Sequence, residues 1–214
     1  MAQLSRSVVV VGAGPGLGAA VARRFAREGY RPVLLARRPE QVDGLDDAVR
    51  LAVDAGDPEA LEAAFAQVRS AVGDPEVLVF NPSPTVLAPP SEVAPEDVLL
   101  GLRVVAVGAV VAAQAVLPAM REAGRGTLLF TGSGAALRPY PPMVAVAVQK
   151  AALRAYVLAL ADEVAPWGVH AGLVTVQGVL GSSPALEPDA VAEAFWTVHS
   201  QPAQLWDKEL EIRA

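Results

Sequence analysis

The stretch VVVVGAGPGLGAA, residues 8–20, decides the fold of this chain. Its run of valines is typical of a strand that is buried on both faces of a parallel sheet. The alternating glycines that follow are Gly12, Gly14, Gly16 and Gly18. Glycine permits a tight strand-to-helix turn and lets backbone N–H groups approach a diphosphate, to which the helix start adds partial positive charge. The turn therefore predicts a nucleotide seat, in which we also place Leu17.

The rest of the chain alternates short apolar runs with longer helical patterns, as in a parallel sheet covered by helices. The apolar runs predict strands at Ser7–Gly12, Pro32–Ala36, Arg50–Val53, Glu76–Phe80, Gly126–Thr131, Val169–Thr175 and Glu209–Arg213. The helical patterns predict helices at Gly16–Glu28, Pro58–Val72, Pro95–Glu122, Val144–Ala165 and Pro188–Ser200. We therefore expect residues 1–214 to form one α/β domain, a Rossmann-like, doubly wound parallel sheet of about seven strands with helices on both faces.

Composition narrows the range of functions. With 53% hydrophobic and 19% charged residues, the chain can bury a large core and is not of the disordered class. Its net charge of −6 argues against a nucleic-acid partner, because nucleic-acid surfaces carry net positive charge. The absence of cysteine excludes disulfides and thiol nucleophiles, and only two histidines are present, so we expect no metal site.

The location of the protein is also constrained. The longest apolar run, Val104–Ala113, is about half the length of a membrane span, and Gln114 interrupts it. The amino-terminal residues lack the long apolar core and cleavage site of a secretory signal. We therefore expect a cytoplasmic protein without a membrane partner.

The end of the second predicted strand indicates which nucleotide binds. An acidic residue at this place would hydrogen-bond the ribose hydroxyls and repel a 2′-phosphate. Here Ala36 occupies the place and Arg37 and Arg38 follow it. A small neutral residue leaves room, and guanidinium groups suit a phosphate dianion. The sequence thus favours NADP(H) over NAD(H).

With these residues in view, the chain resembles the short-chain dehydrogenase/reductase family over residues 7–213. The loop VGAGPGLG is similar to the family's T-G-x-x-x-G-x-G motif, with Val11 in place of the Thr. Asp54, in VDAGD, stands where the family contacts the adenine, and Asn81, in VLVFNPS, matches one residue of the N-N-A-G strand end. AVLPAM, GTLLFTGS and a helix that carries a lysine then follow in the family's order.

The resemblance implies a catalytic set of Ser, Tyr, Lys and Asn, of which this chain keeps half. Ser133 matches the serine that orients the substrate carbonyl, and Lys150 matches the lysine that holds the nicotinamide ribose. The tyrosine that exchanges a proton with the substrate corresponds to Val146, and the asparagine corresponds to Val105. A positioned general acid contributes about 10²–10⁴-fold in rate, so this chain needs another proton source.

Tyr140 is the candidate for that source. It lies six residues before Val146, in the proline-rich loop RPYPPM, and the alternative is an aromatic side chain that only covers the sheet edge. Tyr156 should face away from Val146, because ten residues turn a helix by roughly 1000°. Neither His170 nor His199 has a spacing that suggests a triad with Ser133, so we do not expect serine hydrolase chemistry.

Two functional hypotheses follow, with a third behind them. The first is an NADP(H)-dependent oxidoreductase with catalytic Ser133, Lys150 and Tyr140, acting weakly or on an unusual small molecule, either a carbonyl or alcohol or an activated double bond. The second is a pseudoenzyme that binds NADP(H) as a sensor or scaffold. The third is a cofactor-independent isomerase or cyclase. Val146 and Val105 favour the second hypothesis, and Ser133 with Lys150 favours the first.

Two of the predicted helices are apolar around most of their circumference. They lie around residues 96–120 and 144–165, and one face of each can pack on the sheet. The other apolar face needs a partner. In similar proteins these two helices build a four-helix interface, so we expect a homodimer or homotetramer.

Overall fold

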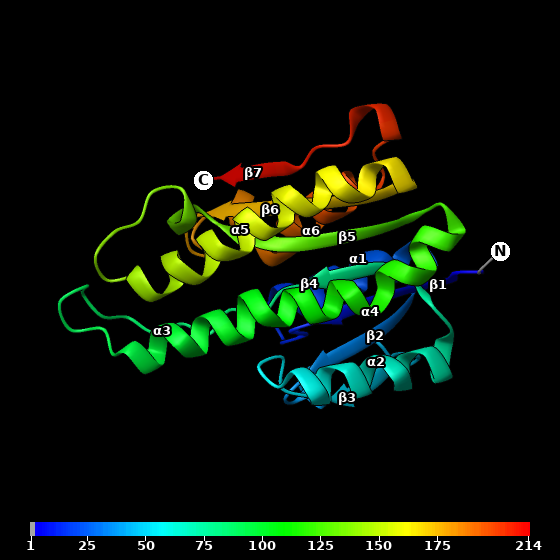
Figure 1. Ribbon diagram of the computed structural model, residues 1–214, viewed down its shortest axis with the longest axis horizontal. Coiled ribbons are helices and arrows are strands. Elements are labelled where there is room, and N and C mark those ends of the chain that lie inside the picture. Colours follow the sequence, from blue (N-terminus) through cyan, green and yellow to red (C-terminus); the bar gives the residue numbers. More distant parts are fainter. Residues whose placement is uncertain (1–2) are drawn as a thin grey trace.

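The computed structural model describes residues 3–214 (Figure 1). Its centre is one sheet of seven parallel strands in the order β3-β2-β1-β4-β5-β6-β7. The strands are β1 (Ser5–Val11), β2 (Arg31–Ala36), β3 (Val49–Ala52), β4 (Pro75–Phe80), β5 (Gly126–Ser133), β6 (Val169–Gln177) and β7 (Glu209–Arg213). The predicted α/β fold with a doubly wound parallel sheet is confirmed, and every predicted strand is present within three residues of its expected bounds.

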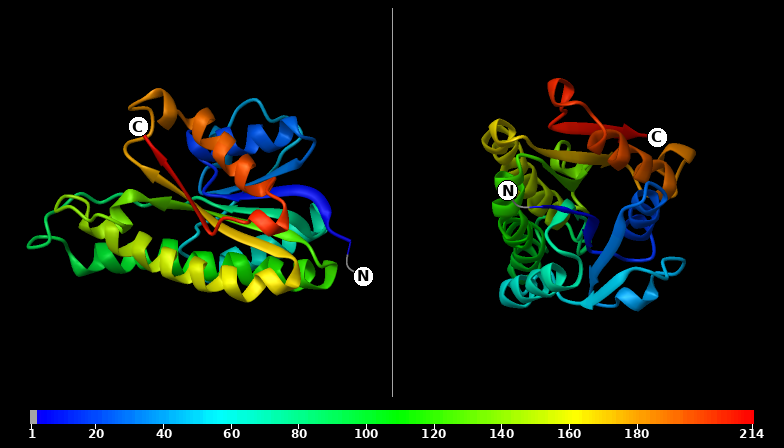
Figure 2. Two further views of the ribbon diagram at one scale, coloured as in Figure 1. Left: turned by 90° about the horizontal axis from the view of Figure 1, so that it is seen from above. Right: turned by 90° about the vertical axis from the view of Figure 1, so that its right-hand side faces the viewer.

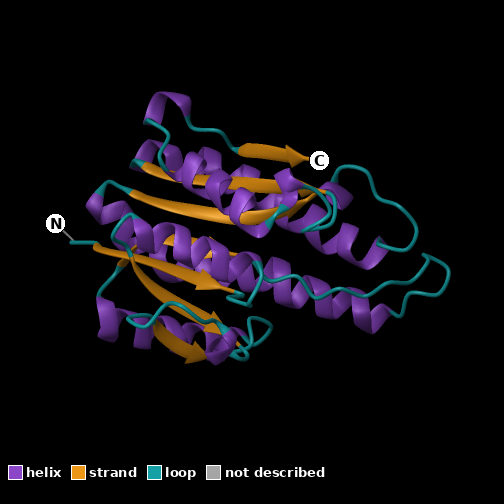
Figure 3. Cartoon of the chain, turned by 180° about the vertical axis from the view of Figure 1, so that it is seen from behind, coloured by secondary structure: helices purple, strands orange, loops and turns teal. Residues whose placement is uncertain are grey.

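The strand order places a ligand crevice. The chain starts in the middle of the sheet with β1, runs outward through β2 to β3, and then returns to β4 on the other side of β1. Open parallel sheets bind their ligands at such a reversal, beyond the carboxyl ends of the strands. In Figure 3 the strand arrows point toward the two long loops that extend past the sheet, the β4–α3 and β5–α5 connections.

Helices cover both faces of the sheet (Figure 2). They are α1 (Leu17–Arg27), α2 (Pro58–Val72), α3 (Pro95–Gly101), α4 (Gly108–Ala123), α5 (Val144–Val164) and α6 (Pro188–His199). One core lies beneath α2, α4 and α5, where Phe65, Phe80 and Phe130 are buried. The other lies beneath α1 and α6, where Phe25 and Phe195 are buried. Burial of apolar area in these two cores is the main stabilising term of the fold.

The long helix predicted at Pro95–Glu122 is present but irregular. Between α3 and α4 the segment Leu102–Val107 is a π-helix. Close contact with the turn after β3 accompanies this irregularity. A Cβ on Gly108 would lie 2.5 Å from the carbonyl oxygen of Ala55, and one on Gly56 would lie 2.9 Å from Val104 Cγ2. Single π turns within α-helices occur frequently at functional sites.

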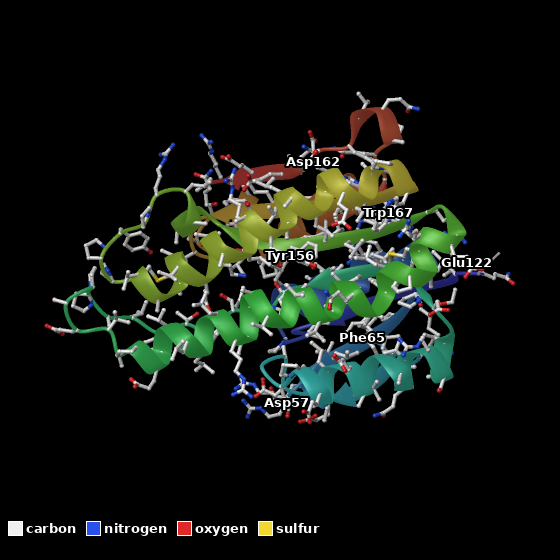
Figure 4. All side chains as sticks on the ribbon, in the orientation of Figure 1. Asp57, Phe65, Glu122, Tyr156, Asp162 and Trp167 are labelled. Carbon is white, nitrogen blue, oxygen red and sulfur yellow. The ribbon has the colours of Figure 1, made fainter. Side chains whose placement is uncertain are left out.

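Two helical stretches, Pro95–Ala123 and Val144–Trp167, are long and apolar enough to cross a membrane. Both pack against the sheet through α4 and α5, and Tyr156 and Trp167 project from the second of them (Figure 4). Within the single chain, 33% and 50% of their apolar windows are buried. A core helix accounts for the buried part.

A polar network lies at the amino ends of the strands, at the opposite end of the sheet from the crevice. The Tyr30 hydroxyl donates to Glu76 Oε1 at 2.9 Å, so at 3.0 Å it can only accept from His199 Nε2. The other ring nitrogen, Nδ1, lies 3.0 Å from the hydroxyl of Thr127. The network therefore makes Nε2 a protonated ring nitrogen, and in the neutral ring Nδ1 accepts from Thr127. Burial lowers the pKa of His199 to about 4.

This network predicts a loss of stability in mild acid. Because the pKa of His199 is lower in the folded chain, its contribution is complete above the unfolded value of about 6.5 and falls as the pH drops toward 4. The free energy of unfolding should decrease by roughly 2–3 kcal/mol over that interval through this group. Urea titrations of the wild type and His199→Gln between pH 7 and 4 measure it. Parallel losses in both proteins would contradict the assignment.

Candidate functional site

A cavity of about 360 Å³ opens at the carboxyl ends of β1, β2, β3 and β4, around the point where the strand order reverses. The predicted site residues that line it are Gly12, Gly14, Arg37, Arg38, Asp54 and Asn81. The structure thus brings together residues from four separate strand ends. The sequence analysis missed further lining residues, among them Gln41, Leu100 and Val104.

Two glycines of the loop are required by the packing of the protein itself. Gly12 has φ +79°, and a Cβ there would lie 2.8 Å from Pro82 N. A Cβ on Gly18 would lie 2.7 Å from the carbonyl oxygen of Gly12. Gly18 therefore lets α1 approach β1 closely, the role of the last glycine in dinucleotide-binding turns.

The other two glycines leave open space. A Cβ on Gly14 or Gly16 would meet no protein atom within 4 Å. Gly16 is the N-cap of α1, no side chain caps this helix end, and no acidic residue lies in its first turn. The Leu17 side chain is buried in the core, so only its backbone can serve a ligand. Free N–H groups and the positive end of the helix dipole fit a diphosphate here.

The end of β2 supplies positive charge to the same cavity. Ala36, Arg37 and Arg38 all line it, and both arginine side chains are exposed. Gln41, in the short 3-10 turn that follows, completes this part of the lining. Its position three residues after the arginine pair was a usable signal, since a polar amide there can also bind phosphate oxygens. The end of β2 thus offers two guanidinium groups and, at Ala36, no acidic side chain. This arrangement favours a 2′-phosphate over free ribose hydroxyls.

Asp54 and Asn81 are both partly occupied by protein contacts. Asp54 Oδ1 accepts from Gly56 N at 2.8 Å, which forms the tight turn after β3. Asn81 donates through Nδ2 to the carbonyl oxygen of Gly12 at 3.0 Å and accepts from the Thr131 hydroxyl at 2.8 Å. Asn81 thus joins the ends of β4 and β5 to the glycine loop.

Ser133 is the last residue of β5 and Lys150 lies on α5. Neither belongs to the cavity lining, so their roles toward substrate and coenzyme stay predictions. The Lys150 side chain is 2% exposed, and its Nζ donates to the carbonyl oxygens of Thr131 at 2.8 Å and Pro82 at 3.2 Å. Burial lowers the pKa of Lys150 to about 7. The ammonium form has three N–H donors, so these two carbonyl oxygens leave its third N–H unused. Ser133 Oγ accepts from Ala135 N at 3.2 Å, which leaves its own O–H free to donate.

Val146 and Val105, which we predict to stand at the family's tyrosine and asparagine positions, belong to the apolar packing. Val146 is 3% exposed and packs with Ala135 and Ala147. Val105 is fully buried in the core beneath α4. Neither can exchange a proton. Tyr140 lies in the β5–α5 loop with its side chain half exposed and is outside the cavity lining, so its catalytic role stays a prediction.

The histidines lie far from Ser133. His170 is the second residue of β6 and pairs with Thr127, whereas Ser133 pairs with Val176 at the other end of the strands. Six residues of parallel strand separate the two positions by about 20 Å. His199 contacts Thr127 as well. Within residues 3–214 there is no group of three or more possible metal ligands.

Comparison with known proteins assigns the chain to a family. A sequence profile for short chain dehydrogenases matches residues 6–184. The "Very-long-chain 3-oxoacyl-CoA reductase" of Aspergillus terreus is 29% identical over 78% of this chain, which spans 50% of that relative. The "NADP-dependent 3-hydroxy acid dehydrogenase YdfG" of Salmonella typhi is 27% identical, with 92% of this chain and 90% of that protein covered.

A solved structure agrees with these relatives. A metagenomic short-chain oxidoreductase in complex with NADP superposes with a TM-score of 0.87 at 29% identity, over 98% of both chains. The matched region contains the glycine loop, the cavity and the Ser133–Lys150 pair. The chain therefore belongs to the short chain dehydrogenase family.

Proposed function

We propose that this chain is an NADP(H)-dependent oxidoreductase of the short-chain dehydrogenase type that acts on a small molecule. The main support is the cavity, which extends from the open space at the glycine loop to the arginine pair after β2. We call this open space at Gly14 and Gly16 the glycine cradle. The names of the relatives support the same coenzyme, since one is NADP-dependent and another was solved with NADP. The chain spans only about half of some relatives, so the substrate is not carried over from them.

Separate groups of residues fit separate parts of the coenzyme. The N–H groups at Gly16 and Leu17 would hold the diphosphate, as at other helix starts. Gly14 would leave room beside it, since its own N–H donates to the carbonyl oxygen of Gly12 at 2.9 Å. Arg37 and Arg38 would bind the 2′-phosphate, Asp54 would contact the adenine, and the remaining N–H of Lys150 would reach a ribose hydroxyl. When bound, the coenzyme supplies or accepts a hydride.

The substrate would react near the end of β5. The free hydroxyl of Ser133 can donate to a carbonyl oxygen and orient it, a contact that stabilises developing negative charge. Tyr140, water or the substrate itself would handle the proton, because Val146 carries no titratable group. An activated C=C or imine acceptor needs less acid assistance than a ketone. We therefore place such acceptors, beside carbonyls and alcohols, in the substrate class.

A second candidate function is a pseudoenzyme that binds NADP(H) without turnover. It is favoured by Val146, whose side chain packs against Ala135 and Ala147 where the family has its proton donor. Spectrophotometric assays of NADPH oxidation with a panel of aldehydes, ketones, imines and enones separate the two candidates. Turnover above the buffer rate supports the oxidoreductase. Tight NADPH binding without any turnover supports the pseudoenzyme, and failure to bind NADPH contradicts both.

Arg37 is predicted to select the coenzyme. In Arg37→Ala the Kd for NADPH should rise about 10–100-fold, since hydrogen bonds between charged groups contribute roughly 1.5–3 kcal/mol. The Kd for NADH should hardly change, because NADH lacks the 2′-phosphate. Calorimetric titration with both coenzymes measures this. Arg27→Ala, on the exposed end of α1 outside the cavity, is the matched control. Equal losses for NADPH and NADH would contradict the role of Arg37.

We also propose that the chain forms a homodimer or homotetramer through the outer faces of its two long apolar helices. Membership of the family and the exposed half of these helices support this. Light scattering after gel filtration should give a mass at least twice that of the single chain. Elution as a monomer at micromolar concentration would contradict it. We place the protein in the cytoplasm, without a nucleic-acid or membrane partner.

A further inference from the structure

Two neighbouring side chains of α5 hold one short segment of the cavity wall. Gln149 and Lys150 are 1% and 2% exposed. Gln149 Nε2 donates to the carbonyl oxygen of Pro84 at 2.8 Å, and Lys150 Nζ donates to that of Pro82 at 3.2 Å. Proline has no backbone N–H, so the carbonyl oxygens are the only backbone polar groups that Pro82 and Pro84 offer. The lysine was identified from the family pattern, whereas Gln149 was missed.

The segment that they hold shapes the coenzyme site. Pro82, Ser83 and Pro84 line the cavity. Pro82 also packs directly on the glycine loop, because a Cβ on Gly12 would lie 2.8 Å from its nitrogen. A shift of this segment would therefore change both the width of the cavity and the position of the loop.

On its other side Gln149 contacts the opposite wall. A Cβ on Gly101 would lie 2.6 Å from Gln149 Oε1 and 3.3 Å from Gln149 Cβ. Leu100, the neighbour of Gly101, lines the cavity. Glycine is unfavourable within a helix relative to alanine. The close packing of Gln149 explains why a residue without a Cβ stands at position 101. Gln149 thus fills the space between Pro84 and the end of α3.

The amide of Gln149 is not there for stability alone. Among the side chains of residues 3–214, its Oε1 is one of the few buried atoms without a hydrogen-bond partner. A buried acceptor that is left unpaired costs free energy, which offsets the hydrogen bond that Nε2 makes. The side chain therefore makes one hydrogen bond, to Pro84, while its contacts reach both walls of the cavity.

We propose that Gln149 is a positioning residue that sets the separation of Pro84 and Leu100 and thereby the affinity for NADP(H). The proposal rests on the proposed coenzyme binding and adds a residue that does not touch the coenzyme. It makes Gly101 and Gln149 a coupled pair. It also separates affinity from stability, which a merely structural residue would not do.

A double-mutant cycle tests the coupling. Gly101→Ala should raise the Kd for NADPH about tenfold, because the new Cβ displaces Gln149 from Pro84. Gln149→Ala should raise it by a similar factor. In the double variant, Gly101→Ala should add almost nothing to the rise in Kd caused by Gln149→Ala, since the amide that the new Cβ displaces is already absent. Independent, additive losses would overturn the proposal.

Gln149→Met separates affinity from stability. Methionine keeps the length of the side chain but removes the donor and the unpaired acceptor together. We expect a Kd for NADPH about tenfold higher and a melting temperature close to that of the wild type. Gln67→Met, at an exposed position of α2, is the matched control and should change neither value.

Each other outcome is decisive. If the wild type binds NADPH and the Gln149 variants bind it equally well, the inference is wrong and the proposed function stands. If affinity and melting temperature fall together in Gln149→Met, the residue is structural and the inference is also wrong. If the wild type does not bind NADPH, both the proposed function and the inference fail.

Discussion

Replacing Val146 with tyrosine is expected to raise the rate of NADPH-dependent carbonyl reduction by about 10²–10⁴-fold. Position 146 lies one helical turn before Lys150, so a hydroxyl there would lie on the same face of α5 as the lysine. Two other members of the set are present, Ser133 at the end of β5 and the buried Lys150, whereas Val105 stands at the expected asparagine position. Steady-state assays with a small aldehyde and NADPH measure the gain.

Val146→Phe is the control for size. Val146 is buried beside Ala135 and Ala147, so either aromatic residue should destabilise the fold by about 1–3 kcal/mol through overpacking. Only the tyrosine adds an acid. Equal rates for the phenylalanine and tyrosine variants would show that shape is responsible. A wild-type rate that already matches Val146→Tyr would show that the proton comes from elsewhere, and a loss in Tyr140→Phe would then identify Tyr140 as its source.

Gly14→Asp is expected to abolish coenzyme binding while leaving the fold intact. A side chain on Gly14 meets no protein atom within 4 Å and its φ lies outside the left-handed region, so the melting temperature should change little. The carboxylate would occupy the open cradle and repel the diphosphate. The Kd for NADPH should rise at least about 100-fold, as measured by calorimetry.

Gly18→Ala should show the opposite pattern and serves as the comparison. Its Cβ would lie 2.7 Å from the carbonyl oxygen of Gly12, so the clash is with the protein itself. A loss of stability of about 1–3 kcal/mol should accompany any loss of affinity. If Gly14→Asp bound NADPH as tightly as the wild type, the glycine loop would not be the diphosphate seat.

The strands and the cavity could be predicted from the sequence because their signals are local. Runs of valine and leucine mark strands that are buried on both faces. The residue that follows each strand lies at the crevice, because ligands bind beyond the carboxyl ends of the strands. Arg37 was found in this way, whereas Asp54 and Asn81 were found through the resemblance to the family's motifs. All three line the cavity.

Contacts between distant segments left no such signal. The π-helix at Leu102–Val107 packs against the Asp54–Gly56 turn, a contact that no local pattern reveals. The partners of Lys150 are backbone carbonyls, 19 and 68 residues away, and any residue type could supply them. Gln149 had one usable sign, a polar amide directly before Lys150 after the apolar run Val144–Val148.

Calorimetric titration of the wild type with NADPH, and in parallel with NADH, tests the central claim most directly. The glycine cradle and the arginine pair predict one coenzyme bound per chain, with NADPH at least about tenfold tighter than NADH at low salt. The absence of binding by either coenzyme at millimolar concentration, or a clear preference for NADH, would contradict the account.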